Sequence, residues 1–155
     1  MTTTTGRTRP YLYSGLILTA LLALAPLIDI ATADTIADHV REAYPHWSAG
    51  NVEKDRNAIA IYLAAVGVLG TGGWLWTIRS LARRPERAYR TATIMFVLGA
   101  CVALFDLTYG SEQYDRTVPL LYGLLGLIPL IPGTAAVVLL WRDLPRGSWS
   151  KLTAR

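Results

Sequence analysis

The sequence has few of the residues from which catalytic and metal sites are usually built. It contains one Cys and two His in 155 residues, which excludes an intrachain disulfide, a CxxC redox pair and a cysteine-based zinc site. Neither a GxSxG nor an HExxH motif occurs. A haem between helices would need His inside the apolar segments, and both His lie outside them. We therefore expect no metal and no cofactor.

Charged residues are also scarce. They make up 17% of the chain, hydrophobic residues make up 52%, and the mean hydropathy is +0.33. A soluble domain carries roughly a quarter charged residues, so this chain lacks the polar surface that it would need in water. The net charge of +4 comes from basic residues confined to a few segments. That distribution indicates membrane orientation, and no nucleic-acid partner is expected.

Four segments are long and apolar enough to cross a bilayer, which takes about 20 residues of helix. They are residues 11–30, 58–78, 91–109 and 118–141. Pro10 and Pro119 stand where a helix tolerates proline best, in its first turn. The predicted fold is therefore all-α, an integral membrane four-helix bundle formed by a single domain over 1–155.

The Lys and Arg residues predict the orientation of this bundle. Eleven of the fifteen fall in the N-terminal tail, the 79–90 connection and the C-terminal tail, which lie on one side of a four-span arrangement. Nine of the eleven acidic residues fall on the other side. Positive residues favour the cytoplasmic side, so both termini are expected in the cytoplasm and the protein in the plasma (inner) membrane.

A cleavable signal peptide is the alternative interpretation of the first span. Two arginines, an apolar run and Ala31-Thr32-Ala33 suit such a segment. The apolar run is long for a signal peptide, and Asp29 lies in the cleavage region. Retention of residues 1–33 is the favoured prediction.

The connections differ in charge and length. The outer one, 31–57, contains a predicted amphipathic helix over 34–44, with Ile36, Val40 and Tyr44 on one face. Such a helix lies on the membrane surface or caps the bundle. The tail 146–155 is expected to be disordered.

The inner connection, 79–90, is basic. Arginines beside a membrane determine topology and also attract anionic lipid, and the first role is favoured here. The arginines concerned are Arg79, Arg83, Arg84, Arg87 and Arg90.

Two carboxylates lie at the outer ends of helices that run outward. Asp29 and Asp106 each stand at the negative end of a helix dipole and at the membrane boundary, which is a costly place for an acid. Ion pairs with Arg56 and Arg116 are the first explanation, and contact with lipid headgroups is the second. The third is an outer cavity that binds a proton or cation, with tyrosines nearby: Tyr62, Tyr109 and Tyr122.

The remaining polar candidates belong to the outer connection. His39 and Glu42 share a helix face, but Pro45 interrupts the spacing to His46 and a metal needs three or four convergent ligands. Histidines in solvent are the favoured interpretation. A membrane enzyme that uses His39, Glu42 and His46 is the least favoured hypothesis.

Small residues and prolines mark the helix contacts within the bundle. Glycines let helices approach closely, and two prolines three residues apart should bend the fourth span. The residues are Gly67, Gly70, Gly123, Gly126, Pro129 and Pro132.

The layout resembles that of many small four-helix membrane proteins, in arrangement and not in any motif. Small multidrug transporters also have four helices, but they are shorter and carry a membrane-embedded glutamate in the first helix. This sequence has only Asp29, at the far end of that span. It is assigned to no family on this basis.

The sequence suggests two functions, of which the first is favoured. The first is a non-catalytic accessory protein that associates with itself or with a membrane partner. The alternative is a small transporter or channel, coupled to protons or cations, that uses Asp29 and Asp106. The absence of a charged group near mid-membrane argues against transport.

Overall fold

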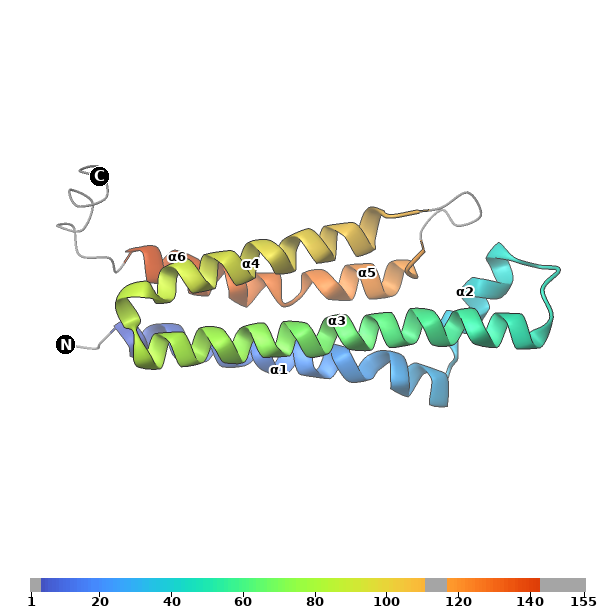
Figure 1. Cartoon of the computed structure of the whole chain (residues 1–155), viewed down its shortest axis with the longest axis horizontal. Coiled ribbons are helices and arrows are strands. Elements are labelled where there is room, and N and C mark those ends of the chain that lie inside the picture. The colour runs from blue at the N-terminus through green and yellow to red at the C-terminus, as the bar shows by residue number, and fades with distance from the viewer. Residues whose placement is uncertain (1–3, 111–116, 143–155) are drawn as a thin grey trace.

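The computed structural model describes residues 4–110 and 117–142, and these are almost entirely helical (Figure 1). The elements are α1 (Thr4–Ala31), α2 (Thr35–Ala43), α3 (Ala49–Arg83), α4 (Pro85–Thr108), α5 (Leu120–Leu127) and α6 (Leu130–Arg142). No strand occurs in this part of the chain, so the all-α prediction is confirmed. Four stretches are long and apolar enough to span a membrane, the fourth comprising α5 and α6. Arg116 and the tail 146–155 lie outside the described residues.

The helices extend beyond the apolar segments that predicted them. Helix α3 has 35 residues and is therefore about 52 Å long at 1.5 Å per residue, whereas the hydrocarbon layer is roughly 30 Å thick. Helix α1 begins at Thr4, so Pro10 lies inside it and does not open it. Apolar composition marks the part of a helix that lipid surrounds, while hydrogen bonding continues the helix into the polar flanks.

Each spanning helix packs against two neighbours, in the cyclic order α1, α3, α4 and the α5–α6 pair. The single residue Arg84 separates α3 from α4. The start of α1 and the end of α6 lie at the same end as this turn (Figure 1). We call it the basic end, and the opposite end, where α2 lies, the α2 end.

Two buried clusters hold the bundle together, one at each end. The cluster at the basic end joins all four spans through residues such as Leu12, Leu81, Ala88 and Leu140. The cluster at the α2 end joins α2, α3 and the start of α5. Between these clusters the helices are held mainly by pairwise contacts.

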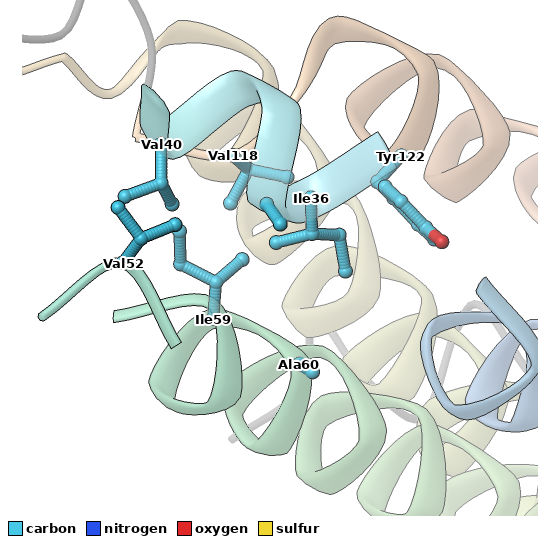
Figure 2. Packing of buried hydrophobic residues seen from close by; sticks show 8 residues of the cluster. Ile36, Val40, Val52, Ile59, Ala60, Val118 and Tyr122 are labelled. Carbon is cyan, nitrogen blue, oxygen red and sulfur yellow. The ribbon is translucent and has the colours of Figure 1, made fainter. Parts of the chain in front are cut away.

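Helix α2 covers its end of the bundle. Ile36 and Val40 are fully buried, and Figure 2 shows them facing Val52 and Ile59 of α3. A short helix was predicted here with Ile36 and Val40 on its apolar face, and of the two roles considered the packing corresponds to a cap. That this end faces outward stays a prediction.

The fourth span is divided into two helices near its prolines, whereas the sequence predicted one bent helix. Helix α5 ends at Leu127 and α6 starts at Leu130. Pro129 and Pro132 have no N–H to donate, so the regular ladder cannot continue through them. It resumes with the N–H of Gly133, which donates to the Pro129 carbonyl at 3.2 Å.

Candidate ligand cavity and its acidic end

An elongated cavity lies between the four spans. Its volume is about 430 Å³. Nearly all of its walls are apolar side chains and glycines from every spanning helix, among them Leu12, Leu22, Leu63, Val66, Met95, Phe96, Leu125, Gly126, Leu130 and Val137. Cavities of this size and composition are typical of sites that take small apolar ligands.

The cavity runs parallel to the helices. Its lining extends along α3 from Leu63 to Thr77 and along α4 from Ala92 to Asp106, a separation of fourteen residues in each helix. At 1.5 Å per residue this corresponds to about 21 Å. The cavity is therefore elongated, a shape that suits an extended hydrocarbon chain.

One side of the cavity opens between α3 and α4. The exposed residues in its lining come from these two helices, namely Leu69, Leu98, Gly99 and Val102. Leu69 is 75% exposed and Leu98 is 56% exposed. Figure 1 shows α4 moving away from α3 with distance from their turn. In a membrane these apolar rim residues would face lipid, so the opening would lead to the hydrocarbon layer.

Asp106 lies at the α2 end of the cavity. Its side chain lines the cavity, and the residue is only 8% exposed. The Tyr62 hydroxyl donates to Asp106 Oδ1 at 2.6 Å and so connects α3 to α4. No Lys or Arg among the described residues pairs with Asp106. The site is thus an elongated apolar cavity with the carboxyl group of Asp106 at one end.

Asp29 has a different role from Asp106. Its Oδ1 accepts the Thr35 hydroxyl at 2.7 Å, and its Oδ2 accepts the Ile36 N–H at 3.1 Å. The first N–H groups of a helix have no partner within it, so Asp29 caps α2. Arg56 pairs with Asp34, at 3.0 Å, and not with Asp29 as the sequence suggested.

The tyrosines expected near the two acids separate in the structure. Tyr62 contacts Asp106, and Tyr122 is buried between the cavity and the cluster at the α2 end. Tyr109 is half exposed and stacks on Phe105, with ring centroids 4.6 Å apart. The proposed partner of Asp106, Arg116, lies outside the described residues, so that pairing stays a prediction.

The candidate metal ligands of the α2 region, His39, Glu42 and His46, do not form a metal site. His46 is exposed, whereas His39 is partly buried and has an interaction of its own. Within residues 4–110 and 117–142, no group of three or more His, Cys, Asp or Glu side chains is placed to hold a metal. At the other end of the bundle the five predicted lipid-facing arginines are all exposed: Arg79, Arg83, Arg84, Arg87 and Arg90.

The glycines singled out in the sequence have two kinds of neighbourhood. A Cβ added at Gly67 would lie 2.6 Å from the Ala23 Cα, and one at Gly70 would lie 2.9 Å from Thr19 Cγ2, so both allow close contact with α1. Gly123 is similarly close to Leu107 of α4, at 3.1 Å. A Cβ at Gly126 would meet nothing nearer than 4.0 Å, because this glycine faces the cavity.

The hydrogen bond between Trp74 and Thr19 beside the cavity was not predicted from the sequence. Trp74 lines the cavity, covers Gly15, and donates its indole N–H to Thr19 Oγ1 at 2.9 Å. Trp74 lies close to the end of its apolar segment, where aromatic side chains commonly lie at the membrane interface. Gly15 on α1 leaves room for the Trp74 ring to turn inward. This can be recognised only when it is known that α1 packs against α3.

The chain was compared with known proteins at three levels. No protein-family model, no curated protein and no solved structure matches it.

Proposed function

We propose that this chain is a non-catalytic multi-pass membrane protein that binds the hydrocarbon part of a lipophilic molecule between its spanning helices. The observation that supports this most is the apolar cavity of about 430 Å³, which opens between α3 and α4. Empty apolar space inside a protein forfeits dispersion contacts. A hydrocarbon chain from the surrounding bilayer would restore those contacts without having to cross water.

The residues that line the cavity favour the binding of a ligand over catalysis. Among the described residues, its polar side chains are Asp106, Tyr122, Trp74 and the hydroxyls of Thr19 and Thr77, with no His, Lys or Cys. Covalent catalysis needs a nucleophile beside a base, and Thr19 is already bonded to Trp74. An enzyme that uses His39, Glu42 and His46 is the weaker alternative, because these residues lie in the α2 region and not in the cavity lining.

The proposed location is the plasma membrane, with both termini in the cytoplasm. Support comes from the arginines that gather at the basic end, namely Arg7 and Arg9 near the start of α1, those flanking the α3–α4 turn, and Arg142 at the end of α6. We also propose that α1 is retained. Its removal would expose Gly67 and Gly70 of α3 and remove one wall of the cavity.

Native mass spectrometry of the protein released in a mild detergent tests the proposed binding. We expect the wild type to carry a non-covalently bound lipophilic molecule and Gly126→Leu to lose it, because the new side chain would extend into the cavity. Gly72→Leu is the matched control, since Gly72 is exposed on α3, has open space around it and does not line the cavity.

Equal occupancy in the wild type and Gly126→Leu would overturn the proposal, as would an empty wild-type protein. A second detergent with a different tail distinguishes a native ligand from a detergent molecule. The same spectrum reports whether a second copy or another membrane protein is bound, which is the association expected of an accessory protein.

Transport coupled to a proton or cation is the second candidate, and the observation that favours it is the buried Asp106 at the cavity. The other acid on which this hypothesis relied, Asp29, is engaged in capping α2. Proton or cation flux into liposomes that contain the purified protein tests transport. Flux that disappears in Asp106→Asn while the protein stays folded would favour a transporter over an accessory protein.

A further inference from the structure

The acidic end of the cavity indicates the head group of the ligand. We propose that the cavity takes a single-chain lipophilic amine, with its ammonium group beside Asp106 and its chain running toward the basic end. This inference rests on the proposed function and deepens it, because it adds a chemical class to a site otherwise defined only by apolar shape.

The first argument is the position of Asp106, the only carboxylate among the described residues that line the cavity. Asp106 is 8% exposed and lies at one extreme of a channel about 21 Å long. A carboxylate at the membrane boundary is costly unless it is paired. Tyr62 supplies one hydrogen bond to one of the two oxygens, and no cation of the described residues supplies a charge. An ammonium group would bring that charge and would donate to the other oxygen.

The second argument concerns the other charges around Asp106. It lies in the last turn of α4, whose free carbonyls make that helix end negative. The first turn of α5 lies against it, since a Cβ on Gly123 would be 3.4 Å from the Asp106 carbonyl oxygen, and that helix end is positive. The two dipole ends oppose one another, which leaves the carboxylate as the dominant charge at this end of the cavity.

The third argument is the route by which the ligand would reach the site. Ile36, Val40, Val118 and Tyr122 form a buried cluster over the α2 end, so the head group would not enter there from water. The opening between α3 and α4 runs along the apolar rim. A molecule that enters there needs a hydrocarbon chain to reside in the bilayer, and the elongated shape of the cavity suits one extended chain.

The test compares two probes in phosphatidylcholine nanodiscs: a long-chain alkylamine with a terminal bromine, and the alcohol of the same chain. Bromine quenches tryptophan fluorescence on contact, and Trp74 lines the cavity. Trp76 is 64% exposed on the outside of the same helix and reports the probe dissolved in lipid. Quenching that is lost in Trp74→Phe but kept in Trp76→Phe therefore measures occupancy of the cavity.

We expect the amine to bind at least about tenfold more tightly than the alcohol, which is the usual scale of a hydrogen bond to a charged group. Asp106→Asn keeps an acceptor for Tyr62 and removes the charge, so the preference for the amine over the alcohol should disappear. Tyr62→Phe, a second variant that leaves the carboxylate in place, should retain the preference.

The outcomes separate the two proposals. Equal affinity of the wild type for both probes would overturn the amine assignment and leave the proposed function standing. The same holds if Asp106→Asn is folded and keeps the preference. If neither probe quenches Trp74 beyond the lipid-exposed level, the cavity does not bind hydrocarbon chains and the proposed function itself is wrong.

Discussion

Helix α3 forms two contrasting contacts, a closed one with α1 and an open one with α4. On the α1 side, Gly67 and Gly70 lie against Ala23 and Thr19, so close that a methyl group would not fit at Gly67 without moving backbone. On the α4 side, the helices are bonded near the turn, where the Ser80 and Thr91 hydroxyls are 3.2 Å apart, and at the far end, where the Tyr62 hydroxyl donates to Asp106. Between these two places, a Cβ on Gly73 would be 3.4 Å from Met95 Sδ. Farther along, Leu69 and Leu98 are exposed.

The difference shows that a glycine-rich helix does not pack closely on every face. Gly72 of α3 and Gly99 of α4 have open space where a side chain would be, although Gly67 and Gly70 lie on the same helix as Gly72. Glycine permits a close approach, but the partner must supply a matching surface. Helix α1 does so with Ala23 and Thr19. The open side instead leaves the cavity accessible.

The largest expected effect comes from filling the closed contact. Gly67→Leu should destabilise the bundle by about 3 kcal/mol, the upper part of the usual range for overpacking, because the obstructing atom is backbone. Gly72→Leu, the same change on the same helix, should leave stability within about 0.5 kcal/mol of the wild type. Unfolding in mixed detergent micelles measures both. Equal unfolding midpoints for the two variants would contradict the close packing of α1 on α3.

The four spans could be predicted from the sequence, whereas the contrast between the two faces of α3 could not. A run of about 20 apolar residues is a local property that follows from bilayer thickness. Which face of α3 packs is not local, since apolar residues surround the helix and periodicity cannot separate the face toward lipid from the face toward protein. The cavity was missed for the same reason.

The two acids illustrate what a sequence can reveal of the site. Tyr62 was correctly named among the tyrosines near Asp106, because both were assigned to the same level of the bundle. Asp29 was interpreted from the helix that it ends, where a carboxylate is unfavourable. The chain turns after Ala31, and Asp29 thereby caps the positive start of α2. Such a contact between consecutive helices depends on the tertiary packing of α2, in which Ile36 and Val40 are buried.

A smaller effect is expected from the hydrogen bond across the closed contact. Thr19→Val removes the acceptor of the Trp74 N–H and should cost about 1 kcal/mol. Thr71→Val is the control, because the Thr71 hydroxyl bonds only the Gly67 carbonyl of its own helix. A double-mutant cycle with Trp74→Phe, followed by unfolding, isolates the interaction. Strictly additive effects of Thr19→Val and Trp74→Phe would show that the bond contributes nothing to the closed contact.

The smallest effect on stability is expected at the open contact between α3 and α4. A substitution there should, however, clearly slow the entry of a probe into the cavity. Gly99→Leu adds a side chain where nothing lies within 4 Å, so stability should change by no more than about 0.5 kcal/mol. The new side chain would narrow the rim through which a chain enters, and the brominated alcohol should therefore quench Trp74 several-fold more slowly after mixing. Final quenching should be nearly unchanged, because the interior keeps its shape.

The neutral probe is used because its entry does not depend on any interaction with Asp106. Gly72→Leu again serves as the control and should quench at the wild-type rate. An unchanged rate in Gly99→Leu would mean that molecules reach the cavity by another route, such as past α2. The open contact would then be a feature of packing alone, and the difference between the two faces of α3 would have no bearing on how the cavity fills.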